Sequence, residues 1–214
     1  MMSRRNLSLA AGMAAAVALT AGALIASTAE ATPEPAEPSL APDFTGTTAT
    51  GETVSLSDFA GQTVILEWTN DGCPFVQKHY AVPPANMQGL QTDASESGVV
   101  WLSVISSAPG RQGHRTGAEV LDMNEGRGAT PAHVILDESG EIGRLYNAKT
   151  TPHMFVITGD GHIAYQGAID DTPSARVSDI ETATNYVSAA MQSLAAGEPV
   201  AVPRSKPYGC SVKY

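Results

Sequence analysis

Two cysteines are the residues of this chain that point most directly to chemistry, because a thiolate sulfur is a strong nucleophile. Cys73 follows an apolar run by a few residues and directly precedes Pro74, a residue that favours the first position of a helix. We therefore expect Cys73 at a helix N-cap, where unpaired backbone N–H groups and the helix dipole lower the pKa of a thiol. A sulfur in that position is suited to attack peroxides or disulfides.

The second cysteine, Cys210, lies close to the C-terminus in a segment that contains Pro203, Pro207 and Gly209. This composition predicts an extended tail that can dock elsewhere on the protein. One interpretation is that Cys210 resolves an oxidised Cys73 by forming an intramolecular disulfide. The alternatives are a permanent structural disulfide, which exported proteins commonly carry, and pairing between two chains.

Short apolar runs predict the strands that would position Cys73. Residues 63–68 are rich in β-branched and apolar side chains, and residues 99–105 form a continuous apolar run that suits a strand buried on both faces. A tight turn at Gly159-Asp160-Gly161 joins the last two runs into a hairpin. The predicted strands are, in chain order, 53–56, 63–68, 99–105, 133–136, 154–157 and 163–165.

Helical segments alternate with these strands. The last one has a capping box, Ser178-Asp179-Ile180-Glu181, and apolar residues at helical spacing up to Leu194, and it is predicted to end at Gly197. Alternating elements that close with a hairpin and a helix predict an α/β sandwich with a mixed sheet. The other predicted helices are 74–80, 84–92, 116–124 and 141–146.

The first thirty residues have the character of a secretion signal and not of the fold. Arg4 and Arg5 precede an Ala-rich apolar stretch, and Ala29-Glu30-Ala31 is a cleavage pattern of signal peptides. The arginine pair also resembles a bacterial twin-arginine signal. The alternative is an uncleaved membrane anchor, for which small alanine side chains are poorly suited.

The chain is accordingly divided into four segments. We expect a signal peptide over 1–31, a Pro-rich linker over 32–42, a folded domain over 43–200 and a C-terminal tail over 201–214 that carries Cys210. The expected location is outside the cytoplasm, periplasmic or secreted, in a bacterium. No attachment to a membrane is expected after the signal is cleaved.

The composition is that of an acidic globular protein. With 43% hydrophobic and 16% charged residues, the chain can bury a core. Its formal net charge of −10 argues against nucleic acids and anionic membrane surfaces as partners. We interpret the acidity as a source of solubility.

A strand, a loop, Cys73-Pro74 and a helix, followed by Thr151-Pro152 before a later strand, resemble the thioredoxin fold. Residues 72–80 and 208–213 resemble a peroxiredoxin-like branch of the alkyl hydroperoxide reductase/thiol-specific antioxidant family, and the resemblance extends from about Ala41 to the end. It implies a thioredoxin-like three-layer α/β sandwich, with a mixed central sheet flanked by helices. It also implies that Thr151 and a cis Pro152 shape the substrate groove beside Cys73, and it implies no bound cofactor.

The chain departs from the patterns of both families. Val76 stands where thioredoxins have their second cysteine, so a C-x-x-C dithiol is absent. Asn70 stands where typical peroxiredoxins have Thr or Ser, and Thr151-Pro152-His153 stands where they place an arginine beside the sulfur. Arg144 and Lys149 are the candidates to replace that arginine.

The five histidines and one glycine-rich segment are the remaining candidates for a functional role. His79 either raises the thiolate fraction of Cys73 or lies on the surface, and we favour the surface position. His153 either approaches the sulfur or is turned away by strand alternation. The other three histidines are interpreted as structural, and two distant cysteines do not predict a copper or zinc site. The segment 110–117 does not match a phosphate-binding loop; it either borders the active site or is an ordinary surface loop, and we favour the surface loop.

These patterns favour a peroxiredoxin-like thiol oxidoreductase. Cys73 would attack a peroxide or a protein disulfide, Cys210 would resolve the product, and an external thiol would reduce the disulfide. One alternative is a thiol-disulfide reductase or exchange protein that acts on exported proteins. Another is a non-enzymatic thioredoxin-fold module with a structural Cys73-Cys210 disulfide. The electron donor and the oligomeric state are left open.

Overall fold

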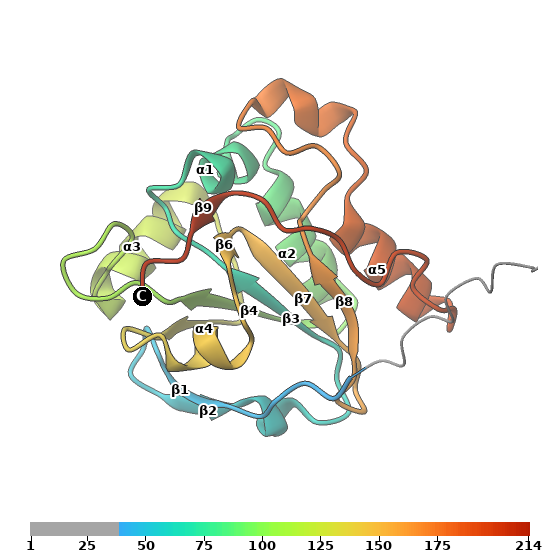
Figure 1. Ribbon diagram of the computed structural model, residues 1–214, viewed down its shortest axis with the longest axis horizontal. Coiled ribbons are helices and arrows are strands. Elements are labelled where there is room, and N and C mark those ends of the chain that lie inside the picture. The colour runs from blue at the N-terminus through green and yellow to red at the C-terminus, as the bar shows by residue number, and fades with distance from the viewer. Residues whose placement is uncertain (1–38) are drawn as a thin grey trace, which may run out of the picture. The chain divides into compact units, whose positions relative to one another are not determined.

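A seven-stranded mixed sheet forms the centre of the fold in the computed structural model, which describes residues 39–214 (Figure 1). Its strands are β1 (Thr45–Thr48), β2 (Thr53–Ser55), β3 (Val64–Trp68), β4 (Val100–Ile105), β5 (His133–Leu136), β7 (His153–Ile157) and β8 (Ile163–Gly167). They lie in the order β2-β1-β5-β4-β3-β7-β8; β3 with β4 and β4 with β5 pair in parallel, and the other neighbours are antiparallel. The predicted signal peptide and residues 32–38 of the predicted linker lie outside the described residues.

Helices cover both faces of this sheet. They are α1 (Pro74–Tyr80), α2 (Asn86–Glu96), α3 (Gly117–Arg127), α4 (Glu141–Leu145) and α5 (Tyr186–Ala195), with the 3-10 helices η1 (Leu56–Phe59) and η2 (Val177–Glu181). Helices α1, α2 and α5 contribute to the core on one face, whereas α4 contributes to the core on the other. This three-layer, thioredoxin-like α/β arrangement confirms the predicted fold class. Across residues 39–214, each helix is too short or too polar to cross a bilayer.

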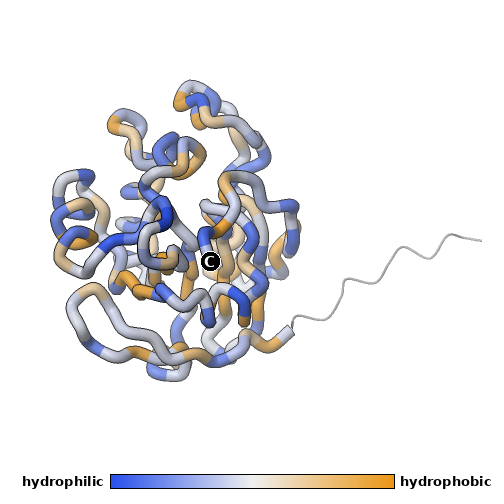
Figure 2. Tube along the Cα trace, turned by 60° about the vertical axis from the view of Figure 1, so that its left-hand side comes forward, coloured by the Kyte–Doolittle hydropathy of each residue, from blue (hydrophilic) through white to orange (hydrophobic). Residues whose placement is uncertain are grey.

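The two central strands are apolar because both faces of the sheet are covered. Every residue of β3 is buried, and so is every residue of β4 except the first. Alternate side chains enter opposite cores, so that Ile65 lies in the core with α1 and α2 while Leu66 lies in the core with α4. Figure 2 shows hydrophobic stretches along the interior strands. The prediction of a doubly buried strand at 99–105 is confirmed.

The last helix differs from its prediction. Apolar spacing predicted one helix capped at Ser178, but the chain forms η2, leaves the helix and starts α5 after Asn185. The Asn185 side chain accepts a hydrogen bond from Ser188 N at 2.9 Å, and Thr184 N donates to the Asp171 carboxylate at 3.0 Å. A second N-cap and a bond to a distant loop therefore divide the predicted helix.

Three strands have no counterpart in the sequence prediction. They are β1, β6 (Thr150–Thr151) and β9 (Cys210–Ser211). Strands β6 and β9 form an antiparallel pair that is separate from the seven-stranded sheet. Two-residue strands contain too few side chains for a hydrophobic alternation, so only the tertiary contact defines them. The pair holds the C-terminal tail, which runs from α5 across the molecule toward α1 (Figure 1).

Candidate functional site

Cys73 lies at the N-cap of α1, after the loop that follows β3. Its backbone is extended, with φ −89° and ψ 120°, and its carbonyl oxygen accepts hydrogen bonds from Val76 N and Gln77 N at 2.9 Å each. Pro74 occupies the first helical position. The predicted N-cap placement is confirmed, and the Cys73 side chain has no solvent exposure.

The loop that carries Cys73 is braced by residues 107–116, which follow β4. Asn70 accepts a hydrogen bond from Gly72 N at 2.9 Å and donates one to the carbonyl oxygen of Gln112 at 3.1 Å. The Gln112 side chain in turn donates to the carbonyl oxygen of Gly72 at 2.8 Å. The sequence favoured an ordinary surface loop for this glycine-rich segment over a border of the active site, but the segment supports the cysteine loop directly.

Beside the sulfur lies the Thr151-Pro152 peptide, which is cis. Cys73 Sγ donates a hydrogen bond to the Thr151 carbonyl oxygen at 3.1 Å. The Thr151 hydroxyl is buried and has no nitrogen or oxygen partner within residues 39–214. It is therefore available to donate to the sulfur when Cys73 is a thiolate. The structure brings together the three residues that the resemblance linked.

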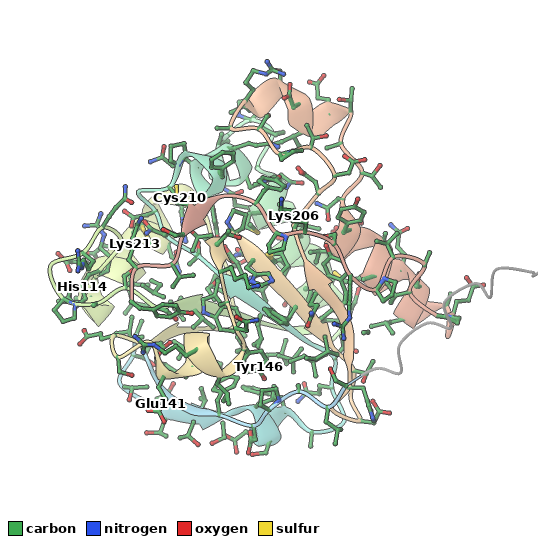
Figure 3. The ribbon with its side chains drawn as sticks, viewed as in Figure 1. His114, Glu141, Tyr146, Lys206, Cys210 and Lys213 are labelled. Carbon is green, nitrogen blue, oxygen red and sulfur yellow. The ribbon has the colours of Figure 1, made fainter. Side chains whose placement is uncertain are left out.

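Cys210 reaches the same place from the tail. It lies opposite Thr151 in the antiparallel β6–β9 pair and joins the apolar cluster that contains Cys73 and Val76. Figure 3 shows Cys210 on the tail near α1. Gly209 permits this approach, since its φ is +134° and a Cβ at this position would lie 2.0 Å from the Thr151 carbonyl oxygen. Both cysteines are free thiols in the structure.

The two thiols have opposite pKa shifts. Burial raises the pKa of Cys73, but hydrogen bonds from the side chain and backbone of Cys210, from Val76 N and from Thr151 outweigh burial, and the net pKa is lowered. Burial, then donation to the Cys73 sulfur, raises the pKa of Cys210 to about 11. Cys73 is thus the thiol that ionises first, and Cys210 remains protonated as its hydrogen-bond donor.

A buried polar cluster lies under the tail next to this site. The Lys78 ammonium forms an ion pair with Asp170 at 3.2 Å, and Tyr208, two residues before Cys210, donates its hydroxyl hydrogen to Asp170. His79 lies 3.7 Å from the same carboxylate. We call Lys78, His79, Asp170 and Tyr208 the Asp170 cluster.

The surface position expected for His79 is wrong. Its side chain is fully buried, and Nδ1 lies 2.9 Å from the Asn86 side-chain amide. Burial lowers the pKa of His79 to about 4, although the Asp170 carboxylate acts in the opposite direction. The helix face that carries His79 is covered by the tail and by residues near Asp170, and neither could be placed from the local sequence.

His153 is turned away from the cysteine. Its ring packs on Phe155, with centroids 4.7 Å apart, and Nδ1 accepts a hydrogen bond from Lys149 N at 3.3 Å. Arg144 stacks on the Tyr214 ring at 4.6 Å. Within residues 39–214, no arginine or lysine side chain hydrogen-bonds the Cys73 sulfur, so neither candidate replaces the arginine of typical peroxiredoxins at that atom.

Sequence reasoning also missed a buried carboxylate, Glu67, at the end of β3. It accepts hydrogen bonds from the Tyr80 hydroxyl at 2.8 and 3.0 Å, from Trp101 Nε1 at 2.9 Å and from Ser103 Oγ at 2.9 Å. This network joins β3 and β4 to the last turn of α1, the helix that begins at Cys73. Its only signal in the sequence was a single charge inside an apolar strand.

Comparisons with known proteins agree with the fold. The AhpC/TSA family model matches residues 39–166. A solved structure of an uncharacterized conserved protein from Geobacillus kaustophilus is 24% identical, with a TM-score of 0.68 over 83% of this chain and 91% of that chain. A hypothetical protein from Sinorhizobium meliloti is 20% identical, with a TM-score of 0.68 over 83% of this chain and 93% of that chain. No curated protein matches the chain.

Proposed function

This chain belongs to the AhpC/TSA family of thiol-dependent redox proteins, and we propose that it is a two-cysteine peroxidase in which Cys73 attacks and Cys210 resolves. The observation that carries the proposal is the position of Cys210 against a fully buried Cys73, with the pKa of Cys73 lowered and that of Cys210 raised. A nucleophile and its resolving partner need this difference, because only the first must be a thiolate before the oxidant arrives.

The proposed reaction has three steps. The Cys73 thiolate attacks one peroxide oxygen, the O–O bond breaks, and the products are a Cys73 sulfenic acid and, after protonation, an alcohol or water. The Cys210 sulfur then attacks the Cys73 sulfur, the S–O bond breaks, and water leaves as the disulfide forms. An external dithiol supplies two electrons and two protons to regenerate both thiols.

A second candidate is thiol-disulfide exchange with another protein. It is favoured by the position of Thr151-Pro152 beside the sulfur and by the β6 backbone, which already pairs with an extended segment in the form of β9. In this reaction Cys73 would form a mixed disulfide with the substrate, and Cys210 would release the substrate as a thiol. The substrate would first have to displace β9, because Cys73 is not exposed.

The test compares the two oxidants on the same reduced protein. One equivalent of hydrogen peroxide, or of a protein with an exposed disulfide, is added, and free thiols and the peptide map are followed over seconds. Loss of both thiols with peroxide and a Cys73-Cys210 peptide, absent in Cys73→Ser, supports the peroxidase. Reaction with the disulfide alone selects the second candidate. A disulfide that resists mild thiols, with a potential below roughly −300 mV, would identify a structural bond instead.

Export of the protein belongs to the proposal too. It is supported by Arg4 and Arg5, the apolar stretch that follows them and the Ala29-Glu30-Ala31 pattern. The N-terminal sequence of the protein recovered from the periplasm or medium of an expressing bacterium tests it. A mature N-terminus at residue 32 is expected, and an intact N-terminus in the cytoplasm would contradict it.

A further inference from the structure

Tyr208, two residues before Cys210, fixes the C-terminal tail near Cys73, and we call it the anchor of the tail. The Tyr208 hydroxyl donates to Asp170, and the Tyr208 ring packs edge-on against Phe75, with centroids 5.8 Å apart. The Lys78 ammonium lies 5.8 Å from the centre of the same ring. Tyr208 is therefore held by a carboxylate, an aromatic edge and a cation at once.

The carboxylate that receives this anchor is itself immobilised. Asp170 is 3% exposed, and it accepts hydrogen bonds from Lys78 Nζ at 3.2 Å and from Thr172 N at 3.0 Å. Lys78 has no exposed side chain and also donates to the Thr172 carbonyl oxygen at 3.2 Å. A buried charge pair with further hydrogen bonds is rigid, because loss of either partner leaves an uncompensated charge. Moreover, Lys78 lies on α1, the helix that begins at Cys73.

The chain between anchor and cysteine is short. Two residues of extended backbone span at most about 7 Å. A fixed Tyr208 therefore confines Cys210 to a small volume near the N-terminus of α1, where Cys73 lies. On the other side of Cys210, Val212 N donates to the Lys149 carbonyl oxygen at 3.1 Å. Cys210 is consequently held from both sides, by the side chain of Tyr208 before it and by the backbone of Val212 after it.

We propose that Tyr208 is a positioning residue that holds the Cys210 sulfur at attacking distance from Cys73. Asp170 accepts the Tyr208 hydrogen bond, and Lys78 fixes Asp170 through an ion pair. The inference rests on the proposed role of Cys210 as the resolving cysteine. In the step concerned, the Cys210 sulfur bonds to the Cys73 sulfur, the S–O bond of the sulfenic acid breaks, and its oxygen leaves as water. Positioning acts on this second step, because the Tyr208 hydroxyl donates to Asp170 and makes no hydrogen bond to the Cys73 sulfur.

Tyr208→Phe tests the proposal because it removes the hydroxyl and keeps the ring against Phe75. The matched control is Tyr214→Phe, which removes a tail hydroxyl that donates to the Ala148 carbonyl oxygen at 2.8 Å on the far side of Cys210. After one equivalent of hydrogen peroxide, loss of the Cys73 thiol and formation of the disulfide are timed separately. A hydrogen bond to a charged group predicts that the ratio of the second rate to the first falls about tenfold in Tyr208→Phe. The control should keep the wild-type ratio.

The sulfenic acid provides a readout that a purely structural role would not change. In Tyr208→Phe it should persist long enough to be trapped by dimedone, and excess peroxide should convert more of it to the sulfinic acid. A second variant, with two glycines inserted after Tyr208, keeps the anchor but lengthens the connection and should also slow disulfide formation. Wild-type rates in both variants would overturn the proposal.

An equilibrium measurement separates this inference from the proposed peroxidase activity. The Cys73-Cys210 disulfide is equilibrated with glutathione, and its effective concentration is compared between wild type and Tyr208→Phe. A roughly tenfold decrease supports the anchor even if peroxide proves not to be the substrate. An unchanged value in folded Tyr208→Phe contradicts the anchor even if the peroxidase reaction is confirmed.

Discussion

Cys210 lies directly opposite Thr151 in the antiparallel β6–β9 pair. The carbonyl oxygen of this threonine also accepts a hydrogen bond from Cys73 Sγ, so one residue contacts the nucleophile and pairs with the strand of its proposed resolving partner. Movement of the tail therefore changes both the solvent access and the hydrogen bonding of Cys73. The predictions below follow from this connection.

Replacement of the proposed resolving cysteine should separate the two chemical steps. In Cys210→Ser, the Cys73 thiol should still react with peroxide, but no intramolecular disulfide can form and the sulfenic acid should accumulate. In Cys73→Ser, the remaining thiol of Cys210 should not be lost on addition of peroxide. Mass spectrometry of the Cys73 peptide after dimedone treatment measures the difference. Equal amounts of trapped sulfenic acid in wild type and Cys210→Ser would argue against a resolving role.

The Thr151 hydroxyl should support the Cys73 thiolate. Thr151→Val keeps the shape and removes the donor, so the pKa of Cys73 should rise and alkylation by iodoacetamide at neutral pH should slow by a few-fold to tenfold. Thr69→Val is a matched control, because Thr69 also has a buried hydroxyl without a partner but does not contribute to the pKa shift of Cys73. Rates measured from pH 5 to 10 give the pKa. An unchanged pKa in Thr151→Val would rule out the contact.

Gly209→Ala should release the tail. The added Cβ would lie 2.0 Å from the Thr151 carbonyl oxygen, so the β6–β9 pair must open and Cys73 should become accessible. The substitution also forces a side chain into a positive φ, at a cost of about 1–2 kcal/mol. Gly197→Ala controls for that strain, since Gly197 has φ +70° and open space around its Cβ. Faster alkylation of Cys73 in Gly209→Ala alone is expected, whereas equal rates in both variants would contradict the close approach.

Acid should destabilise the fold through two buried histidines. Burial lowers the pKa of His79 and of His153 to about 4 from an ordinary value of 6.5. A lowered folded-state pKa favours the neutral ring, so this contribution is complete above pH 6.5 and is lost as the pH falls toward 4. The loss amounts to about 3 kcal/mol per histidine at most.

Urea denaturation at pH 7.5, 6, 5 and 4 measures that loss, and the free energy of unfolding should decrease steadily below pH 6.5. Ring NMR signals identify the groups responsible. Titration of His79 and His153 near 6.5 would show that their rings are not desolvated as the structure indicates.

Local sequence was sufficient for the elements around the nucleophile. The N-cap at Cys73 follows from Pro74, and the doubly buried strand at 99–105 follows from an uninterrupted apolar run. Such features depend on neighbouring residues, so they could be predicted one segment at a time. The same reasoning failed over 178–197, where the Asn185 cap and a bond to Asp171 divided the helix. The domain boundaries and the catalytic roles of the cysteines stay predictions.

By itself, the sequence determined the α/β class and the helix N-terminus that holds Cys73, because each depends on residue type and short spacing, and its resemblance to a thiol redox family agreed with the family-model match. Only the tertiary structure placed Cys210 in the cluster with Cys73, paired β9 with β6 and buried Lys78 with Asp170. These contacts join residues about 60 to 140 positions apart, and no local propensity encodes them. They form because the partly buried Tyr208, Cys210 and Val212 pack against the core and the Lys78–Asp170 pair is satisfied, which together offset the entropy of closing such long loops.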